Sequence, residues 1–269
     1  MIPDWLSVLI LTAAPFAFLG VGFRRSWADP VLAQVAVVST LAGGAVALVV
    51  KFLLYPGLQT AMGVDLRTAL ADTDSWLVKG TISIFLVGAL EEGGKLAGAL
   101  GSLAQSQALH RPPAAFLACL GAGLGFATLE NLDYFVQFGP ATLLLRSLVS
   151  TTGHLVFSGL IGVAMGAALQ ASARRPMTGY LLLLGGYLGG AILHGAFNLV
   201  ALETAGETAV PILLSVLAVG LVVLHEGWHR LLRSDRARGD LPWICEGCGA
   251  HNEAPGRFCP ACGRRQGVG

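Results

Sequence analysis

Long apolar segments recur along this chain and leave few folds open to it. A helix needs about 20 apolar residues to cross a bilayer, and its backbone polar groups must be bonded within the helix. Seven stretches meet this requirement: Trp5–Gly22, Val31–Leu54, Trp76–Ala104, Ala114–Leu132, Leu143–Leu169, Gly179–Ala201 and Ala209–Leu224. The mean hydropathy of +0.69 and the charged fraction of 12% also indicate a membrane protein, because soluble domains carry about 25% charged residues. We therefore predict an all-α, multi-pass protein of the lipid bilayer.

The loops between these segments alternate in charge. Arginines follow spans one, three, five and seven, whereas aspartates and glutamates dominate the other loops. By the positive-inside rule, the N-terminus is predicted outside the cell membrane and the C-terminus in the cytoplasm. The first arginines come after the first apolar run, which favours a retained span over a cleaved signal peptide. A net charge of +1 without a basic stripe predicts no nucleic-acid partner.

Four of the five cysteines form two CxxC pairs near the C-terminus. They are Cys245, Cys248, Cys259 and Cys262. Four thiolates at this spacing are typical of a closed structural zinc site, and Gly249 and Gly263 suit the tight turns that follow each pair. Redox-active pairs are the alternative, but they need a thioredoxin-like context that this short tail lacks. We predict a zinc ribbon that binds a cytoplasmic partner.

These features divide the chain into three parts. We predict a transmembrane helical domain over residues 1–224, a basic cytoplasmic linker over 225–241 and the zinc ribbon over 242–266. A closed zinc site does not itself catalyse a reaction, so any chemistry is expected in the membrane domain.

Two adjacent carboxylates and a lysine interrupt the third span. Glu91 and Glu92 precede Lys95 by one helical turn, so ion pairs within the helix are expected. A charge at the centre of a spanning helix costs about 2.5–3.5 kcal/mol, so charges there need partners. Because one lysine cannot neutralise two carboxylates, the second acid needs a proton, a metal ion or a donor from another helix.

The next three spans carry polar residues that can supply this partner. They are Glu130 and Asn131 in span four, His154 in span five, and His194 with Asn198 in span six. His194 and Asn198 are four residues apart and share one helix face. Single polar residues of this kind often only join helices, but titratable groups on four consecutive helices predict one functional cluster.

This set of groups suits hydrolysis of a peptide bond. A carboxylate buried beside another one binds a proton more readily, so Glu91 or Glu92 is expected to activate water. We expect His154 and Glu130 to position water or metal. We expect His194 with Asn198 to stabilise the oxyanion. Lys95, Phe126 and Asn131 are expected to support the site.

A metal-dependent arrangement of the same groups is the alternative. Glu91, His154 and His194 would then hold a catalytic zinc ion with an open position for water. The predicted spans contain neither HExxH nor GxSxG, so no soluble hydrolase template chooses between the two mechanisms.

In order and spacing these motifs resemble the PrsW family of intramembrane proteases, relatives of the CAAX prenyl endopeptidases. The motif EExxK is matched at Glu91–Lys95, FxxxEN at Phe126–Asn131 and HxxxN at His194–Asn198, with a histidine segment from His154 between them. The resemblance implies an endopeptidase that cleaves a membrane-anchored protein, typically an anti-sigma factor, with zinc or with glutamate alone. CAAX enzymes have histidine in the second motif, which leaves the role of Glu130 open.

Two other classes of function remain as alternatives. In a membrane sensor or scaffold, the buried charges would form a structural network and the ribbon would recruit a partner. In a transporter, the same charges would line an ion or proton path, although no inverted repeat is visible in the sequence.

Overall fold

The computed structural model describes residues 20, 29–140, 142–143, 146–172, 175–203, 209–238, 243–245, 247–252 and 258–264. Its elements are α2 (Pro30–Val49), η2 (Val50–Leu54), α3 (Tyr55–Met62), α4 (Leu66–Asp72), α5 (Trp76–Thr81), η3 (Ile82–Gly88), α6 (Ala89–Gln105), α7 (Pro112–Phe138), η4 (Arg146–Ser150), α9 (Thr151–Ser172), α10 (Pro176–Glu203), α11 (Ala209–Arg238), β1 (Trp243–Ile244) and β2 (His251–Asn252). The segments η2, η3 and η4 are π-helical. The prediction of a helical membrane protein with a small C-terminal cysteine module is confirmed.

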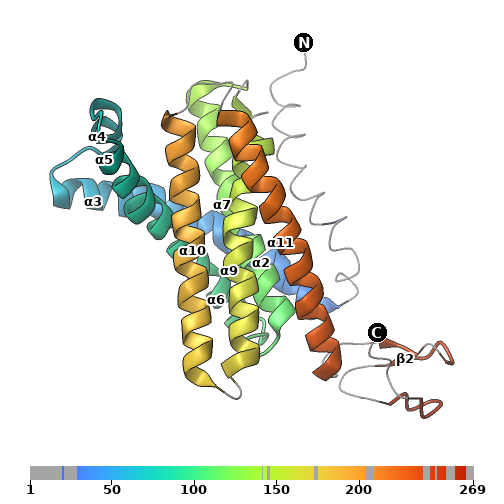
Figure 1. The fold of residues 1–269 in the computed structure, drawn as a ribbon. Helices are drawn as coiled ribbons and strands as arrows, with labels where there is room; N and C mark the ends of the chain where they lie inside the picture. Colours follow the sequence, from blue (N-terminus) through green and yellow to red (C-terminus); the bar gives the residue numbers. More distant parts are fainter. Residues whose placement is uncertain are drawn as a thin grey trace.

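The long helices pack into one bundle around α7 (Figure 1). In α7, 89% of the most apolar 18-residue window is buried, compared with 28% in α10 and in α11. The outer helices therefore expose an apolar face, as expected of helices surrounded by lipid.

Six predicted spans coincide with described helices, and the first, Trp5–Gly22, lies outside the described residues except for Gly20. By length and composition, five helices in the described part are able to cross a membrane. The continuous helix from α5 through η3 to α6 is not one of these five, since charged side chains lie in its middle. The count of seven spans therefore stays a prediction.

Glycines allow α2 and α7 to approach closely. A methyl group on Gly125 would lie 1.8 Å from the carbonyl oxygen of Thr40, and one on Gly43 would lie 2.1 Å from that of Ala122. Both clashes involve backbone atoms, which cannot move aside as a flexible side chain does. Small residues thus set the spacing of the central helix pair.

Three short helices, α3 to α5, project from the side of the bundle (Figure 1). Local signals define their ends: Gly63 closes α3 at a φ of +64°, and Asp65 caps α4 through a 2.9 Å bond from the backbone N–H of Thr68. Lys79 Nζ lies 2.6 Å from Glu203 Oε1 and joins α5 to the end of α10.

A buried ion cluster joins three helix ends. The Arg111 guanidinium donates to Asp29 from two nitrogens, at 3.2 and 2.7 Å, and lies 3.4 Å from Asp235 Oδ2. Burial lowers the pKa of Arg111, but its bonds to Asp29 and the charge of Asp235 outweigh this, so the pKa is raised. The cluster fixes the start of α2, the start of α7 and the end of α11 at one end of the bundle.

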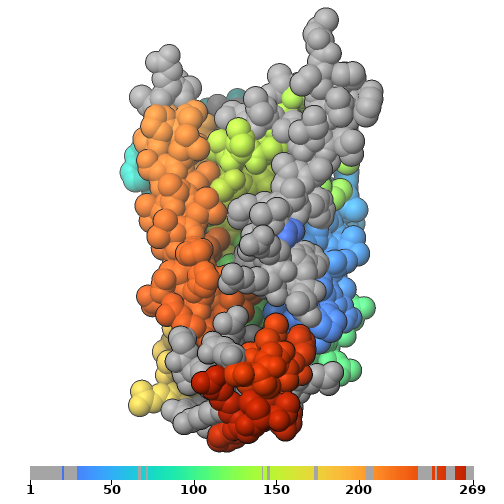
Figure 2. Space-filling view, turned by 90° about the vertical axis from the view of Figure 1, so that its right-hand side faces the viewer, coloured from blue at the N-terminus to red at the C-terminus, as the bar shows by residue number. Residues whose placement is uncertain are grey.

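The C-terminal module lies at the end of the bundle where α9 ends and α10 begins (Figure 1). In the space-filling view it forms a compact lobe below α11 (Figure 2). Helix α11 continues without a break to Arg238, so most of the predicted linker extends the last spanning helix.

Candidate functional site

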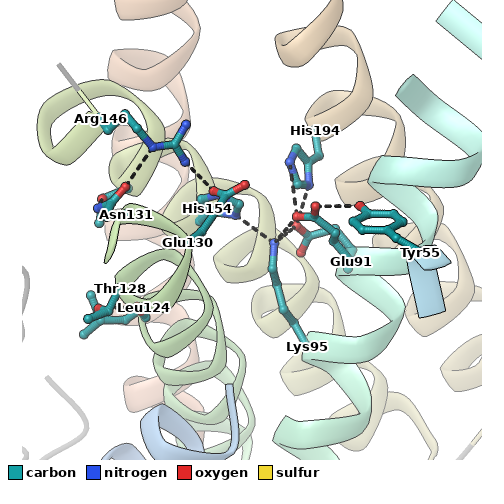
Figure 3. A network of polar contacts seen from close by, with 12 residues as sticks. Tyr55, Glu91, Lys95, Leu124, Thr128, Glu130, Asn131, Arg146, His154 and His194 are labelled. Atoms are coloured by element: carbon teal, nitrogen blue, oxygen red, sulfur yellow. Dashed lines mark hydrogen bonds and ion pairs between the residues drawn. The ribbon is translucent and has the colours of Figure 1, made fainter. Parts of the chain in front are cut away.

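Titratable side chains from four helices meet inside the bundle (Figure 3). They are Glu91, Glu92 and Lys95 of α6, Glu130 of α7, His154 of α9 and His194 of α10. All except Glu130 are at most 5% exposed. The Glu130 side chain is 24% exposed and lies at the edge of the group. The structure therefore brings together the acids and imidazoles that are far apart in the sequence.

Glu92 is fully bonded to its neighbours. Its Oε1 accepts from Lys95 Nζ at 2.7 Å and lies 2.9 Å from His194 Nδ1. Its Oε2 accepts from Ser158 Oγ at 2.9 Å. Because this carboxylate is 0% exposed and both oxygens are bonded, it holds three helices together.

Glu91 differs, because only one of its oxygens is bonded. Its Oε1 accepts from the Tyr55 hydroxyl at 2.8 Å. Its Oε2 is 3.7 Å from Lys95 Nζ and 3.8 Å from His194 Nε2, and has no hydrogen-bond partner among the described residues. A buried carboxylate oxygen without a partner is costly unless something else binds there.

Lys95 determines which nitrogen of His154 carries the proton. The ammonium lies 4.3 Å from the centroid of the Phe126 ring and 2.8 Å from His154 Nδ1. An ammonium only donates, so Nδ1 accepts and a neutral ring carries its proton on Nε2. That nitrogen is 2.9 Å from Glu130 Oε2, which accepts the bond.

A second group of polar residues holds Glu130. Arg146 donates to Glu130 Oε2 at 2.5 Å and to Asn131 Oδ1 at 3.1 Å. Asn131 Nδ2 in turn donates to Thr151 Oγ1 at 2.7 Å, and the guanidinium lies 3.6 Å from the centroid of the Tyr134 ring. Glu130 and Asn131 therefore orient His154 and the start of α9.

His194 presents its second nitrogen to Glu91. Its Nδ1 faces a carboxylate oxygen of Glu92, which only accepts, so Nδ1 carries the proton of the neutral ring. Phe157 stacks on the ring, with centroids 5.0 Å apart and planes 19° apart. The lone pair on Nε2 is thus left facing Glu91 Oε2 at 3.8 Å.

Two buried acceptors that face each other repel unless a donor or a cation lies between them. A water molecule about 2.8 Å from each atom would donate to both. A proton on the ring or a metal ion would also satisfy both atoms. We refer to this pair of acceptors, Glu91 Oε2 and His194 Nε2, as the acceptor pair.

Each of the three π-helical segments in the described part leads into this cluster. Tyr55 follows η2, α6 with its two acids follows η3, and η4 carries Arg146 and leads into α9 with His154. π turns are rare and occur mostly at functional sites. Their extra residue changes which side chains face the bundle, which is how Tyr55 reaches Glu91.

Sequence reasoning did not select Tyr55, Arg146 or Ser158 as site residues. Pro56 is the one signal for Tyr55, because a proline lacks the N–H that an α-helix would use and so marks an irregular turn. In the sequence, Arg146 is notable only as a positive charge on the side of the membrane that the other loop charges predict to be outside. Nothing in the spacing alone links Ser158 to Glu92.

Asn198 lies one turn beyond His194 on α10 and is half-buried. Within the described residues it makes no polar contact with the acids or histidines of the cluster. Its expected role as a donor to the oxyanion stays a prediction, since that role concerns a bound substrate.

The core cluster fits a metal ion in part. Glu91, His154 and His194 each offer one ligand atom, and these atoms lie within 4.8 Å of one another. One carboxylate and two imidazoles match the three protein ligands of a catalytic zinc site. The acceptor pair is ready to bind, whereas both nitrogens of His154 already contact Lys95 and Glu130. A third bond therefore requires exchange of one of these contacts.

The four predicted zinc-ligating cysteines lie together in the C-terminal module. Their sulfur atoms all lie within 4.8 Å of one another, with 3.5 Å between Cys245 and Cys262 and 3.7 Å between Cys248 and Cys259. Zinc–sulfur bonds of about 2.3 Å in a tetrahedron require separations of about 3.8 Å, close to those observed. This geometry supports the predicted zinc ribbon.

Matching turns shape the two halves of this module. Gly249 (φ +71°) and Gly263 (φ +73°) donate backbone bonds of 2.8 and 2.7 Å to the carbonyl oxygens of Cys245 and Cys259. Desolvation raises the pKa of Cys259, but hydrogen bonds from the backbone N–H groups of Cys262 and Ala261 outweigh it and lower the pKa to about 6. A thiolate is the form that binds zinc.

An HExxH pattern occurs just beyond the last predicted span, at His225–His229, and is not among the expected site residues. Gly227 packs on Val163 of α9, which follows His154 by nine residues. At about 1.5 Å per residue, the pattern therefore lies about 13 Å from His154 along the bundle axis. His225, Glu226 and His229 are exposed. The pattern is therefore separate from the core cluster.

Fold and site together define a class: a multi-pass helical membrane protein with a buried glutamate–histidine cluster and a terminal four-cysteine module. The comparison with known families then gives the family. A model described as "PrsW family intramembrane metalloprotease" matches residues 32–225, and the chain belongs to this family. The resemblance noted from the motifs is confirmed.

Two curated relatives agree with this assignment. The chain is 32% identical over 118 residues to "Protease PrsW" of Shouchella clausii (strain KSM-K16), a match that covers 44% of this chain and 53% of the relative. It is 31% identical over 118 residues to "Protease PrsW" of Geobacillus kaustophilus (strain HTA426), covering 43% and 46%. The chain thus spans about half the length of these relatives. No solved structure matches it.

Proposed function

We propose that this protein is an intramembrane endopeptidase that hydrolyses a membrane-anchored protein. The observation that carries this proposal is the acceptor pair, in which Glu91 Oε2 and His194 Nε2 face each other at 3.8 Å. Water held between two acceptors is polarised and oriented, as hydrolysis requires. The names of the family and of the two relatives support the same reaction.

Glu91, rather than Glu92, is the water-activating acid in this proposal. Glu91 Oε2 has no hydrogen bond to give up among the described residues, whereas Glu92 would lose one of its contacts with Lys95, His194 or Ser158. A general base must lie within hydrogen-bond reach of its water, and only the Glu91 oxygen is available.

The reaction then proceeds by addition and elimination. Glu91 takes a proton from the water while the water oxygen bonds to the carbonyl carbon of the scissile peptide. The resulting oxyanion accepts a hydrogen bond from the Asn198 amide, and from His194 in molecules whose Nε2 has bound a proton from the surrounding water before the substrate enters. Glu91 then returns its proton to the leaving amine as the carbon–nitrogen bond breaks.

The remaining residues position these groups. Lys95 fixes Glu92 and His154 with its ammonium charge, and Phe126 packs against that ammonium. Glu130 orients His154 directly, and Arg146 holds Glu130 in place while it also bonds to Asn131. Burial keeps bulk water away from the cluster and strengthens each of these interactions.

A metal-dependent alternative would use Glu91, His154 and His194 as ligands instead of using Glu91 as the base, with zinc as the ion expected from this donor set. Such an ion, when bound, lowers the pKa of its water and polarises the peptide carbonyl. The acceptor pair supports this form, and the Lys95 contact of His154 supports the metal-free form.

The orientation and partners belong to the same proposal. Loop charges favour an N-terminus outside and a ribbon in the cytoplasm, where it would bind a protein partner. We take the transmembrane domain, linker and ribbon to be residues 1–224, 225–241 and 242–266. The substrate is a single-span membrane protein, and an anti-sigma factor is the substrate class that the family resemblance suggests.

The proposal is tested by comparing protein termini in membranes that contain the wild-type chain or Glu91→Gln. Wild-type membranes should contain new termini, close to the membrane edge of single-span proteins, that are lost in Glu91→Gln. Glu226→Gln is the matched control, because it removes the glutamate of the exposed HExxH pattern and should leave cleavage unchanged.

Two outcomes would contradict the assignment. Identical termini with wild type and Glu91→Gln would remove the peptidase proposal and favour the sensor or scaffold. Loss of cleavage in Glu226→Gln but not in Glu91→Gln would move the active site to α11.

A further inference from the structure

The exposed histidines of α11 are placed to bind a metal ion together. His225 and His229 are four residues apart, and their ring centroids are 4.5 Å apart with the planes at 69°. Both side chains are exposed, so small rotations can aim one nitrogen of each at a common point. We propose that His225 and His229 form a surface site for a divalent transition-metal ion such as Zn²⁺, Ni²⁺ or Cu²⁺.

The chemistry of the pair defines the class of ion. Neutral imidazole is a good ligand for zinc, nickel and copper and a poor one for calcium or magnesium, which prefer oxygen. Two histidines at i and i+4 on one helix face are a recurring way to bind zinc. The spacing and the ring contact therefore point to a chelate rather than to two separate histidines.

Glu226 does not complete a catalytic site here. Its Oε1 accepts from Arg230 Nε at 2.8 Å and lies 3.7 Å from Arg233 Nη2. These contacts direct the carboxylate toward the arginines, so it acts neither as a third ligand nor as a base. Water or a donor from another molecule fills the remaining positions, which makes the site exchangeable.

The site faces outward at the edge of the membrane. Trp228 is buried against Phe116 of α7, with ring centroids 5.3 Å apart, whereas the two histidines lie on the exposed face. Arg230 and Arg233 are exposed in the same turns, so this part of α11 lies outside the hydrocarbon layer. A metal ion in the surrounding water therefore reaches the pair without entering the bundle.

Retention on immobilised Ni²⁺ tests the proposal. The full-length chain is purified without an affinity tag, with Zn²⁺ present to load the ribbon. We expect the wild-type chain to bind the resin and His225→Gln/His229→Gln to lose this retention. The core cluster is at most 5% exposed apart from Glu130, so the resin cannot reach it and the result is independent of the proposed peptidase.

Two control variants separate the pair from single histidines. His110→Gln/His251→Gln removes two other exposed histidines and should elute with the wild type. His229→Gln/Arg230→His keeps the number of histidines but moves one off the shared face, and should elute early. Equal retention of the wild type and His225→Gln/His229→Gln would overturn the proposal. Full retention of the shifted variant would also overturn it.

Discussion

The core cluster and the cysteine module are both able to hold a metal ion, but they are built differently. The four sulfurs of the module lie within 4.8 Å of one another, two pairs of them at 3.5 and 3.7 Å, and two of the four cysteines are buried. In the core, by contrast, the potential ligands already bond to Lys95, Glu92 and Glu130. A closed set of equal ligands suits a structural ion, whereas the core ligands are shared with a lysine and other acids, so an ion there would have to displace existing bonds.

The same contrast appears between two neighbouring residues of the core. Glu92 joins three helices through contacts with both of its oxygens, and Glu91 keeps one oxygen without a hydrogen-bond partner in the described part of the chain. In the proposed mechanism, Glu92 has the structural role and Glu91 the reactive one. Four variants test these two comparisons, taken here from the largest expected effect to the smallest.

Cys245→Ser should cause the largest change. Removing one thiolate opens the closed site, and structural zinc contributes about 10–16 kcal/mol to the folding of small zinc modules. We expect loss of bound zinc, measured by elemental analysis of the full-length chain, with peptidase activity retained by the membrane domain. Cys119→Ser, in the buried part of α7, is the control and should keep the zinc. Unchanged zinc in Cys245→Ser would mean that the four sulfurs do not form the site.

Glu92→Gln should destabilise the bundle. Breaking a buried ion pair by removing one partner costs about 3–5 kcal/mol, because the other charge is left buried. Thermal unfolding in detergent should show a clear fall in Tm, whereas Glu91→Gln, the matched control, should unfold near the wild-type temperature. The reverse order would exchange the roles assigned to the two acids.

Ser158→Ala should have a smaller effect on stability. It removes one hydrogen bond to the Glu92 carboxylate, and bonds to charged groups contribute about 1.5–3 kcal/mol. Ser102→Ala is the control, because Ser102 is buried too but bonds only to the backbone of its own helix. Equal unfolding temperatures for the two variants would show that the Ser158 bond contributes nothing specific.

Tyr55→Phe should have the smallest effect. It removes the hydroxyl that orients Glu91 but keeps the ring, and a net loss of about 1.4 kcal/mol corresponds to a tenfold lower rate. We expect kcat to fall with KM unchanged, in an assay with a cleaved single-span substrate. Tyr187→Phe, which removes a hydroxyl bonded to the Ala89 carbonyl, is the control. A raised KM with unchanged kcat would instead place Tyr55 in substrate binding.

Much of the fold could be predicted from the sequence, because apolar runs and loop charges follow from the physics of the bilayer. The pairing of Glu92 with Lys95 followed in the same way from helical spacing. Contacts between helices could not be predicted in this way. The Asp29–Arg111–Asp235 cluster joins residues that are 82 and 124 positions apart, and no periodic pattern relates them.

Most residues of the candidate site could be predicted from the sequence, but the different bonding of Glu91 and Glu92 could not. Four motifs contain Glu91, Glu130, His154 and His194, and the structure brings these residues together. Tyr55 bonds to one oxygen of Glu91 and leaves the other unbonded, and Tyr55 directly follows the π-helical turn η2. Helical periodicity assumes regular turns, so it cannot predict such a contact.

The wide turns at η2, η3 and η4 make the centre of the protein sensitive to chain length. Each holds one residue more than an α-helical turn would need. Because a π turn fits this extra residue into about one turn of helix, side chains on either side of it face the directions expected of a regular helix that is one residue shorter. An insertion or deletion of one residue in the regular helix beside such a turn would instead rotate all later side chains by about 100°, and would turn an acid or an imidazole toward lipid where a surface loop would tolerate the change.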